Sequence, residues 1–321
     1  MRRILVTGAG GQIGTELVPA LRRLHGTDAV LATDLREPPP GGPSELLDCT
    51  DAAAFADAVR RHRADLVYHL AAVLSAKGER EPLVAYRVNM GCLVNALEVA
   101  REHGCALFFP SSIAAFGPDS PRDPTPQVAI QRPTSMYGIT KVAGELLGDY
   151  YHRRWGVDVR GLRFPGLISH SHPPGGGTTD YAVEIFHAAL AEGRYQCFLA
   201  EGTQLDMMYM PDAVRAAIEV MEADGAALRH RNAYNVTAVQ VTPERLAAAI
   251  REHLPGFEID YRVDPVRQAI ADSWPRRLDD SAAREAWGWR PEYDLAALTA
   301  DMIERLTEAA PVRAPSAAPA G

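Results

Sequence analysis

Cysteine is scarce in this chain and is never paired at short spacing. Four cysteines occur among 321 residues. They are Cys49, Cys92, Cys105 and Cys197. Zinc sites and redox dithiols usually need CxxC or similar pairs, so the pattern favours neither kind of site. We expect free thiols in a reducing compartment and no metal.

Clusters of basic charge and long apolar runs are also missing. The formal net charge is −8, and basic residues form no run longer than pairs such as Arg153-Arg154 and Arg276-Arg277. A nucleic-acid-binding protein more often carries a basic patch, so this class is disfavoured. No segment approaches the roughly 18 apolar residues of a membrane span, and a glycine turn follows the first apolar residues where a signal peptide needs a longer apolar stretch. We therefore expect a cytoplasmic protein that binds neither nucleic acid nor membranes.

The sequence does contain a regular alternation of short apolar segments with helical patterns. Its 47% of hydrophobic residues suffice for a large core. Strands are predicted at Ile4–Val6, Ala29–Asp34, Asp65–His69, Cys105–Pro110 and Val157–Leu162. Helical spacing of apolar residues predicts helices at 12–25, 51–62, 81–103 and 135–155. The alternation predicts an α/β fold, a doubly wound parallel sheet with helices on both faces.

The alternation changes after about residue 165. Residues 170–180 are rich in Pro, Gly, Ser and Thr. Helices are predicted at 182–192 and 211–223, a strand that rejoins the sheet at 234–237, and a helix start at Thr242-Pro243. We therefore divide the chain into three parts. They are a sheet domain at 1–165, a smaller substrate-binding lobe with sheet additions at 166–310, and a disordered tail at 311–321.

A glycine-rich turn lies between the first strand and the first helix. Gly8, Gly11 and Gly14 have the GxxGxxG spacing that permits a tight turn, close approach of a pyrophosphate and packing of helix on strand. The strand before it and the helix after it supply the context that such a pattern requires. Asp34 ends the second strand, where a carboxylate binds ribose hydroxyls and repels a 2′-phosphate. The pattern predicts a Rossmann fold that binds NAD, although Arg36 tempers the preference over NADP and Asp34 could also be a plain surface residue.

Tyr137 and Lys141 stand four residues apart on a predicted helix, so they face the same side. A phenol has an unperturbed pKa of about 10, and a lysine ammonium one turn away favours its ionised form. We therefore expect Lys141 to lower the pKa of Tyr137 and make it a general base. Ser112, at the end of the fourth strand, is expected to hold the substrate oxygen. A YxxxK pair is common by chance, and the glycine turn and the chain order are what make this set specific.

These motifs together resemble those of the extended short-chain dehydrogenase/reductase family, over nearly the whole chain up to about residue 310. The resemblance implies an NAD-dependent oxidoreductase with Tyr137, Lys141 and Ser112 as catalytic residues. It also implies a set of cofactor contacts along the carboxyl ends of the strands. They are Gly8, Gly11, Gln12, Ile13, Gly14, Asp34, Asp48, Cys49, Leu70, Ala71, Ala72, Asn89, Tyr137, Lys141 and Pro165. Asn89 could equally be a polar helix residue, and Asp48-Cys49 an ordinary loop and helix cap.

Four longer segments resemble one branch of this family, the threonine 3-dehydrogenases. They are PSSIAAFG at 110–117, RFPGLIS at 163–169, PGGGTTDYA at 174–182 and MMYMPDA at 207–213. The resemblance implies oxidation of L-threonine at the 3-hydroxyl, in a site with six substrate contacts. They are Ser75, Ser112, Tyr137, Thr178, Thr179 and Asp180.

Some of these assignments keep alternatives. Thr178 and Asp180 could cap the helix that follows, and Ser75 could be a plain loop residue. Arg122, in the Pro/Asp-rich loop before Tyr137, is expected to reach the substrate carboxylate or gate the site, unless it is simply solvated.

Two other functions remain open. A nucleotide-sugar epimerase or dehydratase shares the fold and the Ser–Tyr–Lys set, but typically carries basic residues after the fifth strand, where this chain has the uncharged Phe164–Ile168. A non-catalytic NAD-binding protein would not need to keep Tyr137 and Lys141. Relatives commonly pair through long helices such as those predicted at 81–103 and 135–155, so we expect a homodimer.

Overall fold

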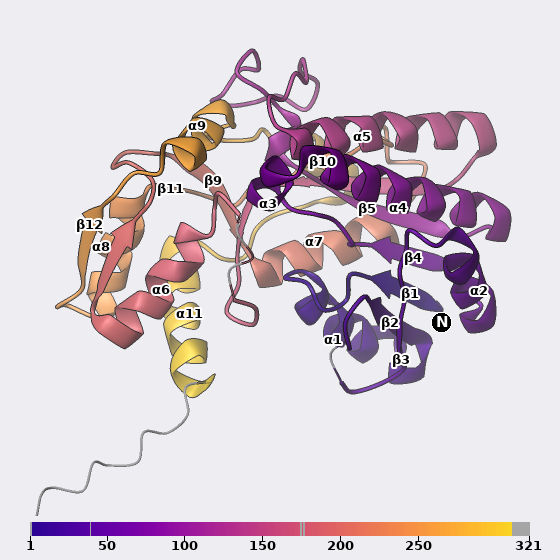
Figure 1. Cartoon of the computed structure of the whole chain (residues 1–321), viewed down its shortest axis with the longest axis horizontal. Coiled ribbons are helices and arrows are strands. Elements are labelled where there is room, and N and C mark those ends of the chain that lie inside the picture. Colours follow the sequence, from indigo (N-terminus) through magenta and orange to yellow (C-terminus); the bar gives the residue numbers. More distant parts are fainter. Residues whose placement is uncertain (1, 39, 174, 176, 310–321) are drawn as a thin grey trace, which may run out of the picture.

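A parallel sheet of seven strands forms the centre of the larger part of the molecule (Figure 1). The computed structural model describes residues 2–38, 40–173, 175 and 177–309, so the predicted tail at 311–321 lies outside the described residues. The strands follow the order β10-β6-β5-β4-β1-β2-β3, and each neighbouring pair is parallel. Their bounds are β1 Ile4–Thr7, β2 Val30–Asp34, β3 Ser44–Leu46, β4 Leu66–His69, β5 Ala106–Ser112, β6 Val159–Phe164 and β10 Tyr234–Asn235. The predicted doubly wound parallel sheet is confirmed.

Helices cover both faces of this sheet, and its strands are therefore buried on both sides. One hydrophobic cluster joins Leu5 and Val67 of the sheet to α2 Ala52–His62, α4 Pro82–His103 and α5 Met136–Trp155. The opposite cluster joins Ile4 and Val6 to α1 Gly14–His25 and α7 Met210–Glu222. The alternation of Ile4, Leu5 and Val6 between the two clusters is the two-residue period of a strand.

The smaller lobe has its own core, built mainly from residues after 165. Its strands form a sheet in the order β11-β9-β7 and a pair β12-β8. The strands are β7 Gly166–Ile168, β8 Arg194–Cys197, β9 Leu205–Tyr209, β11 Val239–Val241 and β12 Glu258–Tyr261. The helices after residue 165, besides α7, are α6 Tyr181–Glu192, α8 Pro243–His253, α9 Pro265–Ser273, α10 Ser281–Trp287 and α11 Leu295–Ala309.

Local capping chemistry explains several helix starts. The side chain of Asp51 accepts a hydrogen bond from the Ala54 N–H at the start of α2. Ser135 caps α5 through the Gly138 N–H, and Thr242 caps α8 through the Arg245 N–H. The predicted starts at Asp51 and Thr242 are therefore confirmed, because a side-chain oxygen placed before a helix satisfies an otherwise unpaired N–H.

Pairing rather than hydrophobicity sets the end of β5. The strand was expected to end at Pro110, but it continues to Ser112 because Ser111 and Ser112 pair with Arg163 and Phe164 of β6. The sequence pattern also missed the short strand β3 and the short helix α3 Ser75–Arg80. Each is too short to show a clear hydrophobic period.

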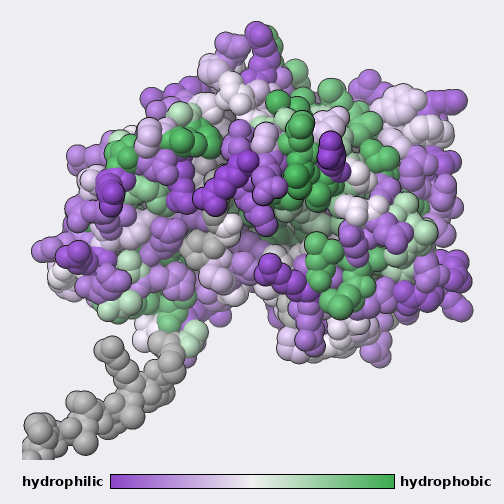
Figure 2. Space-filling model, in the orientation of Figure 1, coloured by the Kyte–Doolittle hydropathy of each residue, from purple (hydrophilic) through white to green (hydrophobic). Residues whose placement is uncertain are grey.

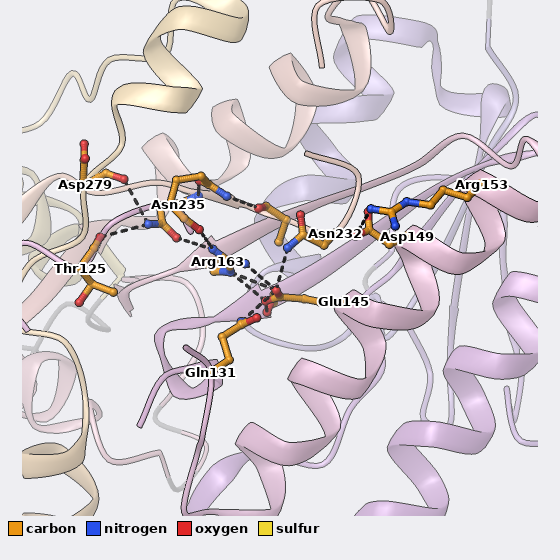
Figure 3. A network of polar contacts seen from close by, with 12 residues as sticks. Thr125, Gln131, Glu145, Asp149, Arg153, Arg163, Asn232, Asn235 and Asp279 are labelled. Atoms are coloured by element: carbon orange, nitrogen blue, oxygen red, sulfur yellow. Dashed lines mark hydrogen bonds and ion pairs between the residues drawn. The ribbon is translucent and has the colours of Figure 1, made fainter. Parts of the chain in front are cut away.

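A buried ion pair joins α5 to β6 (Figure 3). Arg163 Nη2 lies 2.7 Å from Glu145 Oε2, and both side chains are at most 3% exposed. The remaining Glu145 bonds come from the Ser111 hydroxyl, Gln131 and Asn232. Because a buried charge is tolerated only when it is paired and hydrogen-bonded, this network fixes the rotation of α5 about its axis.

Candidate active site

A cleft of about 690 Å³ opens at the carboxyl ends of the parallel strands. It is lined by Gly8 after β1, Asp34 at the end of β2, Leu70 after β4, Ser112 at the end of β5 and Pro165 after β6. Ligands of open α/β sheets bind at this edge, where the strand order reverses between β1 and β4.

The glycine turn has the close approaches that its spacing predicts. Gly8 has a φ of 67°, and a Cβ there would lie 2.7 Å from the Ala71 nitrogen. A Cβ on Gly14 would lie 2.5 Å from the Ala9 carbonyl oxygen. Both positions therefore exclude a side chain, which leaves backbone N–H groups and the start of α1 facing the cleft.

Asp34 is held against this turn. Its Oδ2 accepts a hydrogen bond of 3.0 Å from the Gly10 N–H, and the Arg36 N–H lies 3.3 Å from Oδ1. The carboxylate thus lines the cleft beside the anion-binding turn. Backbone N–H groups of a glycine turn can bind a pyrophosphate, and a neighbouring carboxylate can accept hydrogen bonds from free ribose hydroxyls. These residues therefore fit NAD.

The remaining predicted cofactor contacts mostly line the same cleft. They are Gly11, Gln12, Ile13, Gly14, Asp48, Cys49, Leu70, Ala71, Ala72, Tyr137, Lys141 and Pro165. Asn89 does not line it. Its side chain accepts from the Val73 N–H at 2.7 Å and donates to the Val73 carbonyl at 3.1 Å, so Asn89 holds the loop that forms the wall.

Ser112, Tyr137 and Lys141 meet in the cleft as predicted. Lys141 Nζ donates a 2.7 Å hydrogen bond to the Pro110 carbonyl and lies 5.2 Å from the centre of the Tyr137 ring. The Ser112 hydroxyl accepts a hydrogen bond from the Ala114 N–H at 3.1 Å. The strand end therefore fixes Ser112, and the first two turns of α5 fix the other two.

Burial dominates the protonation of this set. It raises the pKa of Tyr137 to about 12, against the opposing hydrogen bond from Ser112. It lowers the pKa of Lys141 to about 7, against the opposing charge of Glu145. The expectation that Lys141 lowers the pKa of Tyr137 is therefore wrong for the cleft as it stands, because desolvation disfavours the charged form of each group.

The predicted substrate segment lines the opposite side of the cleft in part. Ser75, Thr179 and Asp180 face the cleft, and the Asp180 carboxylate accepts from the Gly177 N–H at 2.7 Å. Asp180 precedes α6 without a side-chain capping bond. Thr178 is fully buried, and its hydroxyl has no hydrogen-bond partner among the described residues. The capping alternative therefore does not explain Asp180.

Arg122 does not line the cleft. Its Nε donates a 3.0 Å bond to the Trp274 carbonyl, and its own carbonyl accepts from the Arg276 and Arg277 N–H groups. Its contact with the substrate carboxylate stays a prediction, and the neighbouring Trp274 does line the cleft. Lys77 and His172 also line it. The sequence offered no signal for these three residues, because their segments reach the cleft only through folding.

In the described part of the chain, no helix is both long and apolar enough to cross a membrane. Within the same residues, no group of three or more His, Cys, Asp and Glu side chains is arranged to hold a metal ion.

The model of the NAD dependent epimerase/dehydratase family matches residues 4–237. The chain belongs to this family. An uncharacterised epimerase/dehydratase of Staphylococcus saprophyticus is 56% identical over 311 residues, covering 95% of this chain and 97% of the relative. NAD, the predicted cofactor, is the one in the family's description.

Two solved structures of the family are similar to the whole fold. The L-threonine dehydrogenase of Clostridium difficile is 51% identical with a TM-score of 0.94, covering 96% of this chain and 98% of that one. The holo form of a GalE-like L-threonine dehydrogenase from Cupriavidus necator is 51% identical with a TM-score of 0.92, covering 95% and 99%. The predicted resemblance to the threonine-dehydrogenase branch of an NAD-dependent oxidoreductase family is confirmed.

Proposed function

We propose that this protein oxidises L-threonine at C3 with NAD, giving 2-amino-3-ketobutyrate. The observation that carries the proposal is that one cleft holds the Ser112–Tyr137–Lys141 set together with Asp180 of the GGGTTDYA segment. A base for an alcohol and a carboxylate for an ammonium group then face the same space. The similarity to solved L-threonine dehydrogenases supports the same substrate.

The base is the Tyr137–Lys141 pair. In the proposed reaction the Ser112 hydroxyl holds the 3-hydroxyl of threonine while the Tyr137 oxygen takes its proton and the phenol's own proton passes to the neutral amine of Lys141. Lys141 Nζ lies 5.2 Å from the centre of the Tyr137 ring and is a second ionisable group in the same buried region. NAD supplies the acceptor for the hydride that leaves C3.

The amino-acid end of threonine needs an anion and hydrogen-bond donors. Asp180 supplies the carboxylate for the ammonium group, and the hydroxyls of Thr179 and Ser75 supply donors for the carboxylate. Thr178 adds a buried hydroxyl without a partner in the described structure. A substrate that lacks the amino group forgoes the ion pair with Asp180 and is expected to react poorly.

A nucleotide-sugar substrate is less consistent with the cleft. Phe164, Pro165 and Leu167 form its wall after β6 and carry no charge for a substrate diphosphate.

The four cysteines are free and buried, which suits a reducing compartment, and we place the enzyme in the cytoplasm. We also propose that it is a homodimer.

The direct test is NADH formation by the purified protein with L-threonine, compared with 3-hydroxybutyrate. Tyr137→Phe should lower kcat by roughly 10²- to 10⁴-fold, the range of a lost general base, while NAD binding persists. Tyr150→Phe is the matched control, since Tyr150 is on the same helix and half exposed. If the wild type forms no NADH with L-threonine, or forms it equally well with 3-hydroxybutyrate, the proposed substrate is wrong. Near-normal turnover of Tyr137→Phe would refute the proposed base.

A further inference from the structure

Two cysteines lie together at the end of the cleft formed by β2, β3 and α4. Cys49 is in the loop after β3 and is 6% exposed, and Cys92 is on α4 and is 2% exposed. Both line the cleft and both belong to the same hydrophobic cluster. Cys105 and Cys197 are also buried but do not line the cleft. The pair therefore borders the space that the cofactor is proposed to fill.

The loop and the helix are fixed to one another next to these thiols. Asn95, three residues after Cys92 on α4, donates hydrogen bonds of 2.9 Å to the Cys49 carbonyl and 3.0 Å to the Thr50 carbonyl. The Asp48 side chain accepts from the Thr50 N–H at 2.9 Å and so shapes the loop itself. The backbone of Cys49 is thus held against the turn of α4 that carries Cys92.

The two thiols affect one another's ionisation. A side-chain hydrogen bond between them lowers the pKa of Cys49, and the same interaction, with burial, raises the pKa of Cys92. The pair is asymmetric: Cys49 is the better source of thiolate, which is the reactive form of cysteine.

We propose that a peroxide oxidises Cys49 and Cys92 to a reversible disulfide. We also propose that this disulfide and bound NAD exclude one another. The Cys49 thiolate attacks hydrogen peroxide, an S–O bond forms, the O–O bond breaks and hydroxide leaves as water after protonation. The Cys92 sulfur then attacks this sulfenic acid, the S–S bond forms, and the S–O bond breaks to release a second water. Two thiols lose two electrons and one peroxide becomes two waters.

The exclusion follows from the position of the pair. Leu47, Asp48 and Cys49 share the cleft wall, so drawing Cys49 onto α4 changes the surface that a cofactor would contact. A bound cofactor, in turn, covers both thiols. This part of the inference rests on the proposed use of the cleft for NAD.

The test measures thiols and NAD binding in the purified full chain, without threonine. After hydrogen peroxide, the denatured protein should show two free thiols in place of four, with peptide mapping of a Cys49–Cys92 bridge and recovery by dithiothreitol. Saturating NAD during treatment should preserve four thiols. The oxidised protein should bind NAD at least about tenfold more weakly than the reduced protein.

Two variants make the test specific. Cys49→Ala should keep the NAD affinity that it has before peroxide, because the thiolate that attacks peroxide is missing, whereas Cys105→Ala should respond like the wild type. Four remaining thiols in the treated wild type, a different bridge, or equal bridging with and without NAD would each overturn the proposal. A protein that binds NAD and forms the bridge but does not oxidise threonine would refute the proposed substrate and leave this inference standing.

Discussion

At the scale of single residues, activity depends on how many protons Tyr137 and Lys141 hold between them. With pKa values of about 12 for the tyrosine and about 7 for the lysine, the pair loses its first proton near neutral pH. Two interacting groups titrate as a unit, so this first step belongs to the pair. A pair with both protons cannot accept another from the substrate hydroxyl. Activity should therefore rise as the pH increases through about 7 and then level off.

Replacing the lysine should move this rise. In Lys141→Met the only remaining acceptor is Tyr137, whose pKa burial raises to about 12, so the rise in kcat should shift to alkaline pH. The measurement is the pH profile of kcat and of kcat/KM with threonine. Lys77→Met is the control, because Lys77 also lines the cleft but is exposed and distant in sequence from α5. An unchanged midpoint in Lys141→Met would contradict the paired base.

At the scale of secondary-structure elements, the position of α5 depends on the Glu145–Arg163 pair (Figure 3). Arg163 also donates to the Gln127 carbonyl and to Asn235, so one guanidinium joins β6 to a loop and to β10. Removing one member leaves the other charge buried and unpaired. The cost of such a change is much larger than the net value of the intact pair.

Arg163→Met should therefore lower the free energy of unfolding by roughly 3–5 kcal/mol. A control pair lies on α5, the helix of Glu145: Arg153 and Asp149 are 3.4 Å apart, and the arginine side chain is 78% exposed (Figure 3). Arg153→Met should cost at most about 1 kcal/mol, because surface pairs contribute little. Denaturant unfolding of both variants gives the comparison, and equal losses would show that the buried network does not hold α5.

At the scale of the whole molecule, α4 and α5 leave apolar side chains uncovered on their outer faces. On α4 these include Leu83, Tyr86 and Val94, and on α5 they include Ile139, Leu146, Tyr150 and Trp155. Figure 2 shows hydrophobic side chains over these helices between polar neighbours. On α5 the spacing of 139, 146 and 150 is one helical stripe. Exposed apolar surface of this kind often marks an interaction site, and a two-fold pairing of the same helices in the proposed homodimer would bury it.

The proposed homodimer predicts a specific effect of charge on this stripe. Leu146→Asp should convert the dimer to monomers, because the carboxylate would be buried unpaired in the interface. Leu24→Asp is the control, since Leu24 is comparably exposed but is on α1, on the opposite face of the sheet. Sedimentation measurements separate the two states. A monomeric wild type, or a Leu146→Asp variant that stays dimeric, would exclude this interface.

The sequence by itself determined the features that depend on local spacing. The strand and helix alternation, the GxxGxxG turn and the Tyr137–Lys141 offset of one helical turn are set by neighbouring residues. The parallel sheet, and the place of most proposed cofactor residues along one cleft, could therefore be predicted. Strand ends were less predictable, because Ser112 joins β5 only by pairing with Phe164.

Only the tertiary structure decided what depends on burial and on contacts between distant segments. It placed Trp274 in the cleft, Arg122 behind it and Asn89 in its supporting wall. It also reversed the expected direction of the Tyr137 pKa shift and brought Cys49 against Cys92. The physical reason is the same in each case. Desolvation and long-range packing are properties of the assembled core, and a local pattern of residues does not contain them.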